Sequence, residues 1–180
     1  STIDNIRNKK IAYKEIWVDD YLKKTNLEIF DVKGVVKNSD IIFVPIQTPH
    51  EEKYEGVTRI PKERADFDYT YLKEGMRQLS NEIDKNGENK IVIIISTVLP
   101  GTIRKEIKPI LSQKIKLCYN PFFIAMGSTM RDFLHPEFVL FGVDDLEAYK
   151  VCKEFYRSVT NAQLYDTTIE NAELIKVSYN

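Results

Sequence analysis

Residues 90–102 read KIVIIISTVLPGT, and this stretch decides the fold. Its apolar residues follow one another without alternation, which is the pattern of a β-strand covered on both faces. Ser96 and Thr97 place two hydroxyls at the tip of that strand, and Pro100-Gly101 then turns the chain. Thr102 stands where it can cap a following helix. A buried strand that leads through a polar tip into a helix is typical of an α/β protein.

Apolar runs of strand length recur on both sides of this stretch, with amphipathic segments of helix length between them. The strand-like runs are Leu27–Phe30, Ile41–Ile46, Lys90–Ser96, Ile115–Tyr119, Phe138–Gly142 and Ala162–Tyr165. The helix-like segments are Tyr71–Lys85, ending before Gly87, Thr102–Ser112, and Asp144–Ser158, which opens on an acidic pair. This alternation predicts an α/β fold with a doubly wound, mostly parallel sheet and crossover helices.

The two ends of the chain differ from what such a sheet requires. A doubly wound nucleotide-binding domain opens with a strand and a Gly-rich turn, whereas this chain opens with polar, helix-like sequence and has no G-x-G-x-x-G. A last helix is predicted to start near Thr168 and to be still running at Asn180. We therefore expect a chain cut at both ends, with the first strands missing. An independent small domain is the weaker alternative, because a sheet without its central strand exposes apolar edges.

The composition is that of one soluble domain. The 180 residues are 43% hydrophobic and 29% charged with a net charge of −1, so no broad field attracts nucleic acid or a membrane. We find no signal peptide, and no apolar run reaches the roughly 18 residues of a membrane span. Cys118 and Cys152 are predicted to be reduced and structural, as in the cytoplasm. His50 and His135 are too isolated to predict a metal site.

Three loops follow the expected strand ends, where open parallel sheets bind their ligands. Thr48-Pro49 comes after Ile41–Ile46, although a strand followed by a proline turn is the commoner meaning of such a pair. Ser96 and Thr97 offer hydroxyls that could hold a water or a cofactor ribose. The apolar segment Tyr119–Thr129 either covers a flat ligand or is a packed loop that closes the core.

A fourth segment lies on the expected last helix. Lys176 and Asn180 are four residues apart and therefore share one helix face. Together they could bind a sugar hydroxyl and an anionic intermediate. The alternative is an ordinary solvated face.

Taken in order, these segments resemble the N-terminal half of the nucleotide-sugar 6-dehydrogenases, the UDP-glucose/GDP-mannose dehydrogenase family. There the pattern runs from T-P through A-D to S-T-V-x-P-G-T, then N-P-E-F-x-x-E-G-[ST], D-x-x-x-P, V-x-x-G and E-x-x-K-x-x-x-N. The matching residues are Thr48-Pro49, Ala65-Asp66, Ser96 to Thr102, Asn120-Pro121, Phe123, Gly127-Ser128, Asp132, Pro136, Val139, Gly142, Glu173, Lys176 and Asn180. The resemblance covers essentially the whole chain. It implies a partial, Rossmann-like dinucleotide-binding domain over residues 1–166 and the start of a long central dimerisation helix over 167–180, with the C-terminal sugar-nucleotide domain absent.

The resemblance also implies an activity: NAD-dependent oxidation of the C6 hydroxyl of a UDP- or GDP-hexose toward the uronate, for polysaccharide biosynthesis, in a cytoplasmic homodimer. NADP stays open, because the acid that distinguishes the two cofactors lies upstream. The residues bordering the cofactor would be Thr48, Pro49, Ser96 and Thr97, with Thr97 also positioning a water. Those contacting the substrate would be Asn120, Phe122, Phe123, Ile124, Gly127, Lys176 and Asn180. Lys176 and Asn180 would stabilise the developing oxyanion.

The chain departs from the family pattern where the chemistry needs acids. Phe122 and Met126 stand at the two family Glu positions, and neither can act as a base or orient a water. The candidate substitutes are Asp132 and Glu137. The family segment P-I-Y-E is read here as Ile11-Ala12-Tyr13-Lys14, and the catalytic Cys has no counterpart. These departures favour an alternative: a non-catalytic or two-electron relative that binds a nucleotide sugar without full oxidation.

Overall fold

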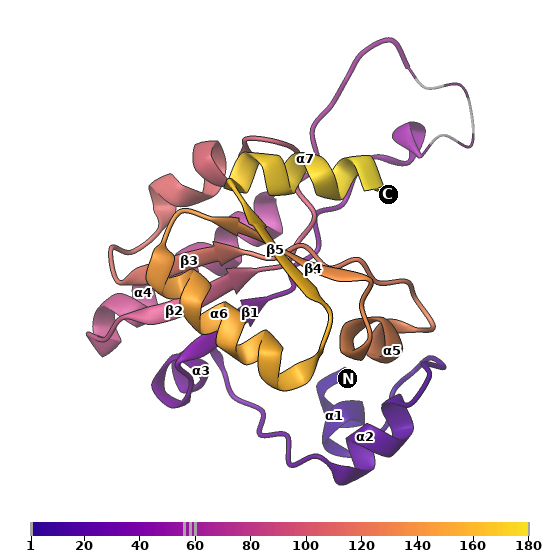
Figure 1. Ribbon diagram of the computed structural model, residues 1–180, viewed down its shortest axis with the longest axis vertical. Helices are drawn as coiled ribbons and strands as arrows, with labels where there is room; N and C mark the ends of the chain where they lie inside the picture. Colours follow the sequence, from indigo (N-terminus) through magenta and orange to yellow (C-terminus); the bar gives the residue numbers. More distant parts are fainter. Residues whose placement is uncertain (1, 56, 58, 60, 180) are drawn as a thin grey trace.

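The computed structural model describes residues 2–55, 57, 59 and 61–179. Within them lies a five-stranded sheet of order β1-β2-β3-β4-β5 (Figure 1). The strands are β1 (Ile41–Val44), β2 (Lys90–Ile94), β3 (Ile115–Tyr119), β4 (Phe138–Val143) and β5 (Gln163–Thr167). β1, β2 and β3 run parallel and β5 is parallel to β4, but β4 is antiparallel to β3. The prediction of a mostly parallel α/β sheet is confirmed, with a reversal that the sequence did not indicate.

The reversal arises in the connection that follows β3. For the next strand to run parallel to β3, the chain must first return to the opposite edge of the sheet. That return takes a crossover of a dozen or more residues, usually a helix packed on the sheet. Here the chain makes a loop and the six-residue helix α5 (Thr129–Leu134), then enters β4 from the edge at which β3 ended. The carboxyl ends of β1, β2 and β3 therefore share one edge, and β4 and β5 end toward the other.

Helices cover both faces of the sheet (Figure 1). α4 (Thr70–Asn86) and α7 (Ile169–Tyr179) bury side chains in one core, and α6 (Leu146–Val159) buries its apolar face in the core on the other side. β2 is buried at every position, which explains its uninterrupted apolar sequence. As predicted, α4 ends at Gly87, which has a φ of 90°, and the acidic pair begins α6, because the Asp145 carboxylate accepts from the Ala148 N–H.

One predicted strand is wrong. Leu27–Phe30 forms neither strand nor helix in the structure, and both of its end residues are exposed. With no neighbouring strand to pair with, the run gains no ladder hydrogen bonds and leads instead into α3 (Val32–Asn38). The Asp31 carboxylate caps that helix by accepting from the Gly34 N–H at 2.8 Å, and the Phe30 side chain lies against Gly34.

The helix predicted over Thr102–Ser112 is irregular. The chain forms a π-helical turn, η2 (Ile103–Ile107), followed by a 3₁₀ turn, η3 (Lys108–Ile110). Pro109 explains the irregularity, because it has no N–H to donate and its ring clashes with the carbonyl four residues earlier. Thr102 does not cap this segment with its side chain, so that prediction is also wrong.

The remaining helices are α1 (Thr2–Arg7), α2 (Val18–Lys24) and the 3₁₀ turn η1 (Glu52–Tyr54). α1 and α2 lie together beside α5, on the side of the molecule away from α7 (Figure 1). The two cysteines are free and buried. Across the described part of the chain, no helix is both long and apolar enough to span a bilayer.

Candidate functional site

The tips of β1 and β2 are joined by side-chain hydrogen bonds at the shared edge. The Thr48 hydroxyl donates to the Thr97 carbonyl at 2.5 Å, and the Ser96 hydroxyl donates to the Ile46 carbonyl at 2.5 Å. Three of the residues predicted to border a cofactor are thus neighbours. Ser96 is buried, whereas Thr48 and Thr97 are half-buried and Pro49 is exposed. The Ser96 and Thr48 hydroxyls hold the edge together, and Thr97 remains partly accessible there.

The turn that follows Thr97 is braced by Tyr69. The Tyr69 hydroxyl accepts from the Leu99 N–H at 3.1 Å and from the Thr102 hydroxyl at 3.2 Å, and it donates to Asp66 at 2.5 Å. Burial, together with the hydrogen bond to Asp66, raises the pKa of Tyr69 to about 12, so its hydroxyl keeps its proton. The sequence indicated Asp66 as part of a motif but gave no sign of Tyr69.

A carboxylate from α7 holds the same turn from the other side. Glu173 is fully buried, and its two oxygens accept from the Gly101 N–H at 2.5 Å and the Ile103 N–H at 2.8 Å. Burial raises the pKa of this carboxyl, and the two N–H donors offset only part of that rise. Glu173 therefore does the capping that was predicted for Thr102. The motif spacing, one turn before Lys176, could have indicated it.

Lys176 reaches the loop that follows β3. Its ammonium nitrogen lies 5.0 Å from the centroid of the Phe123 ring, and its side chain is buried. Burial lowers the pKa of this ammonium. Phe123 also packs on Tyr179, with ring centroids 4.8 Å apart. α7 thus brings Lys176 to the predicted substrate segment. Asn180, predicted to share this face, lies outside the described residues.

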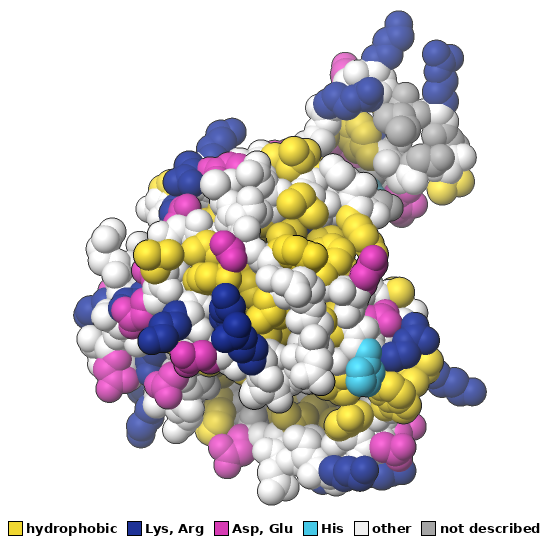
Figure 2. Space-filling model, viewed as in Figure 1, with side chains coloured by type: hydrophobic (Ala, Val, Ile, Leu, Met, Phe, Trp, Pro, Cys, Tyr) yellow, Lys and Arg dark blue, Asp and Glu magenta, His cyan; other side chains and the backbone are white. Residues whose placement is uncertain are grey.

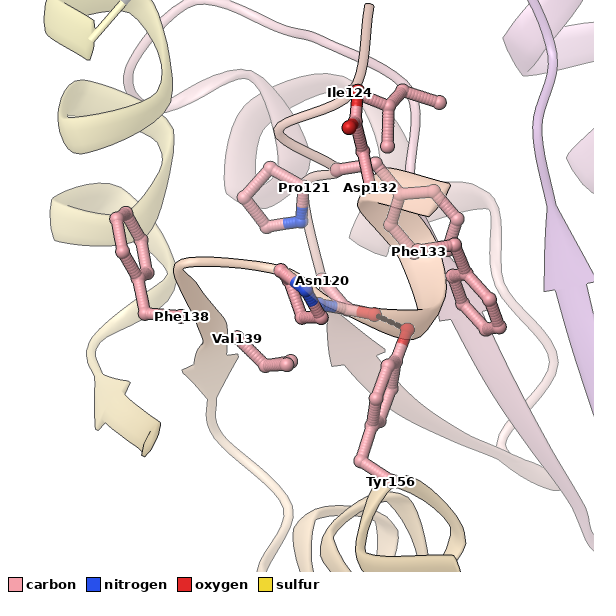
Figure 3. A pocket seen from close by; sticks show the side chains of 10 residues that line it. Asn120, Pro121, Ile124, Asp132, Phe133, Phe138, Val139 and Tyr156 are labelled. Carbon is pink, nitrogen blue, oxygen red and sulfur yellow. Dashed lines mark hydrogen bonds between the residues drawn. The ribbon is translucent and has the colours of Figure 1, made fainter. Parts of the chain in front are cut away.

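The loop after β3 begins at a buried amide. The Asn120 side chain donates to the Leu140 carbonyl at 2.9 Å. It also accepts from the Tyr156 hydroxyl, and this bond is drawn in Figure 3. Both of these bonds are internal, so the Asn120 side chain anchors the loop. A small, almost wholly apolar pocket lies beside it, with Pro121, Phe133 and Val139 in its wall (Figure 3).

The two residues at the family Glu positions have different surroundings. The Phe122 ring packs on Phe133, with centroids 5.5 Å apart, in the core on the α6 side of the sheet. Met126 is 95% exposed. The possible substitutes are engaged elsewhere. Asp132 accepts from the Ser128 hydroxyl at 2.6 Å and the Ala125 N–H at 3.1 Å, which lower its pKa, and Glu137 accepts from the Tyr179 hydroxyl at 2.8 Å.

The far end of the loop is held by a residue that sequence reasoning missed. Glu15, next to the Ile11–Lys14 segment, accepts from the Gly127 N–H at 2.9 Å and also from the Thr129 N–H. Burial raises the pKa of Glu15, but these hydrogen bonds outweigh it and leave the pKa below the ordinary Glu value. The Glu that ends the family segment P-I-Y-E could have indicated this residue, because a shift of that comparison by one residue aligns this Glu with Glu15.

Comparison with known proteins identifies relatives of the chain. The sequence profile described as the UDP-glucose/GDP-mannose dehydrogenase family, NAD binding domain, matches residues 1–160. The chain is 27% identical over 158 residues to GDP-mannose 6-dehydrogenase of Pseudomonas aeruginosa, covering 83% of this chain and 34% of that protein. It is 25% identical over 185 residues to UDP-glucose 6-dehydrogenase of Rickettsia conorii, covering 99% of this chain and 40% of that protein. The chain thus spans well under half the length of these relatives.

Solved structures show the same fold. A ternary complex of GDP-mannose dehydrogenase from P. aeruginosa superposes with a TM-score of 0.84 at 24% identity, covering 99% of this chain and 41% of that one. A UDP-glucose dehydrogenase from Pyrobaculum islandicum superposes with a TM-score of 0.80 at 22% identity, covering 98% and 40%.

Proposed function

This chain belongs to the UDP-glucose/GDP-mannose dehydrogenase family, and from that premise we propose that the full-length protein oxidises the C6 hydroxyl of a UDP- or GDP-hexose with NAD. The observation that supports this most directly is the position of Lys176. Its buried ammonium lies 5.0 Å from the Phe123 ring, on the loop that leaves the same sheet edge as Thr97. A cation on this loop and a half-buried Thr hydroxyl at the same sheet edge would supply an oxyanion partner and a group that holds a water.

The residues at the β1–β2 edge fit the part of an NAD site that borders two parallel strands. Thr48 and Thr97 are small, half-buried and fixed by their shared hydrogen bond, and Pro49 is exposed next to them. The buried Ser96 would support this edge without facing the cofactor directly, since its hydroxyl donates to the Ile46 carbonyl. NAD supplies one chemical step, acceptance of a hydride from the carbon that bears the hydroxyl.

Substrate contacts would come mainly from the middle of the loop after β3. The Asn120 side chain is already bonded within the protein, and the Gly127 N–H and C=O are bonded to Glu15 and Ile16. Phe122, Phe123 and Ile124 would therefore lie along the sugar and offer backbone groups to it. Lys176, with Asn180, would stabilise the negative charge that develops on the C6 oxygen as the hydroxyl loses its proton, before C6 gives its hydride to NAD.

The alternative is a relative that stops before full oxidation. Phe122 packs against Phe133 and Met126 points into solvent, so neither can activate the water that hydrolysis needs. Asp132 and Glu137 are hydrogen-bonded elsewhere. Losing a general base typically costs about 10²–10⁴-fold in rate, so the second oxidation would suffer more than the first.

The test is to count the hydrides transferred. The full-length protein is incubated with NAD and either UDP-glucose or GDP-mannose, and the NADH formed per sugar consumed is measured. Two NADH per sugar supports full oxidation, and one supports the alcohol-to-aldehyde alternative. Binding without NADH supports the non-catalytic alternative, and neither binding nor NADH would contradict both.

We also propose that the full-length protein is a homodimer joined through the helix that α7 begins, with residues 167–180 as its first part. Figure 2 shows hydrophobic side chains gathered where α7 and β5 cross this face. Leu174, Ile175 and Tyr165 are exposed there. The two free cysteines support a reducing compartment, which fits the cytoplasm.

A further inference from the structure

We propose that Glu15 is a positioning residue for the substrate loop, and that the segment Glu15-Ile16-Trp17 forms a clamp on the loop's far end. This proposal rests on the proposed function, because it takes the ligand of that loop to be a nucleotide sugar. The clamp reaches the loop from 112 residues away in sequence. Its hydrogen bonds to the loop go to Gly127 and Thr129, so it would act on substrate binding through loop position.

The clamp consists of three hydrogen bonds to two residues. The Glu15 carboxylate accepts from the Gly127 N–H at 2.9 Å and from the Thr129 N–H, while the Ile16 N–H donates to the Gly127 carbonyl at 3.2 Å. Bonds to a charged acceptor are about twice as strong as neutral ones. Gly127 has a φ of 92°, a conformation that glycine adopts freely, so the turn needs outside partners to stay in one arrangement.

Trp17 supports the same segment. It has a φ of 67°, which is rare for a bulky residue and persists only where the surroundings enforce it. Its ring meets His135 edge to face, with centroids 6.0 Å apart. His135 directly follows α5, and Thr129 begins it. The clamp therefore contacts both ends of α5, the helix that follows the substrate loop.

Both ends of the loop are thus fixed. Asn120 anchors the start through Leu140 and Tyr156, and Glu15 anchors the end at Gly127. Asp132 adds an internal hold on the same turn through the Ala125 N–H. A loop fixed at both ends loses less conformational entropy when a ligand orders it, so release of one end weakens binding.

The experiment compares Glu15→Gln with Glu28→Gln in the full-length protein. Glu28 is an exposed glutamate of the same N-terminal region with no hydrogen bond to the loop. Hydrogen exchange is followed over residues 121–133, and binding of UDP-glucose, GDP-mannose and NAD is measured by calorimetry. We expect Glu15→Gln to speed exchange of this segment about tenfold. The Kd of the nucleotide sugar that binds should also rise about tenfold, with the NAD Kd and the melting temperature unchanged.

Glu15→Asp tests whether the effect comes from the hydrogen bonds or only from the loss of a negative charge. It keeps the charge but shortens the reach, so its exchange and affinity should fall between wild type and Glu15→Gln. Exchange equal to that of Glu28→Gln would overturn the clamp. Faster exchange with unchanged sugar affinity would overturn its role in substrate binding. Because exchange needs no ligand, it separates failure of the clamp from failure of the proposed substrate class.

Discussion

The turn after β2 and the loop after β3 lie at the same edge of the sheet but are held in different ways. The turn after β2, residues 97–103, is braced by buried groups, the Glu173 carboxylate and the Tyr69 hydroxyl. The loop after β3, residues 120–129, is buried at Asn120 but held at its far end by the half-exposed Glu15. A buried partner is costly to lose because water cannot replace it, whereas water can replace an exposed one. The turn that we propose borders the cofactor is therefore held more firmly than the far end of the loop that we propose contacts the substrate.

Lys176 lies on α7, the helix that also holds the β2 turn through Glu173, and its loss should have the largest effect. Lys176→Met keeps the length of the side chain but removes the cation proposed to stabilise the oxyanion. We expect kcat to fall by about 10²–10³-fold, the usual loss for such a group. Steady-state kinetics of the full-length protein measure kcat, and urea unfolding checks that the variant is folded.

The control is Lys150→Met, at an exposed position on α6. Equal kcat in the two variants would remove Lys176 from the proposed chemistry.

Glu173→Gln tests the buried brace on the β2 turn. The amide can accept from only one of the Gly101 and Ile103 N–H groups, and its own NH₂ then faces the other. We expect a loss of about 2 kcal/mol in the free energy of unfolding. Glu154→Gln, on the exposed face of α6, should change it by less than about 0.5 kcal/mol. If urea midpoints show equal stability for the two variants, the turn is not held as the comparison requires.

Tyr69→Phe should have a smaller effect on the same turn. It removes the acceptor for the Leu99 N–H and the Thr102 hydroxyl while leaving the ring in place. We expect a loss of about 1.5 kcal/mol in unfolding free energy. Tyr71→Phe, at an exposed position two residues further along the chain, is the matched control. A loss as large in Tyr71→Phe would mean that the hydroxyl of Tyr69 contributes nothing specific.

The weakest effect concerns the pH dependence of the substrate loop. The folded-state pKa of Glu15 is lowered, so the hold on Gly127 is complete above the ordinary Glu pKa of about 4.3 and is lost as the pH falls through the lower folded value. The Gly127 amide shift, followed by NMR from pH 7 downward, should stay constant and move only below about pH 4.3. The movement should vanish in Glu15→Gln. A midpoint at or above the ordinary value would contradict the charge-assisted bonds.

Local sequence patterns predicted the regular elements well. β3 has the predicted bounds, β2 ends two residues early, and Gly87 and Asp145 delimit helices as expected. These succeed because burial on both faces of a strand, and capping, depend on residues close in the chain. The two wrong predictions followed a local pattern that another factor overrode. Leu27–Phe30 had the composition of a strand but no partner, and Pro109 disrupted a helical periodicity.

The candidate site was predicted in part. Motif order indicated Thr48, Ser96 and Thr97, which the structure joins at one edge, and Lys176, which it places at Phe123. Motif order gave no sign that the Asn120 side chain is bonded internally. It likewise could not predict that Phe122 is packed in a core while Met126 is exposed, because both are apolar residues.

The sequence by itself determined the α/β class, the family and most element boundaries, because each depends on periodicity and motif order along the chain. The tertiary structure alone decided the antiparallel turn into β4 and the contacts made by Glu173 and Glu15. The physical reason is the sequence separation of the partners. A carboxylate can accept from any backbone N–H, so its bond to one that lies 112 residues away produces no sequence pattern around either residue. Only the folded chain shows which one it meets.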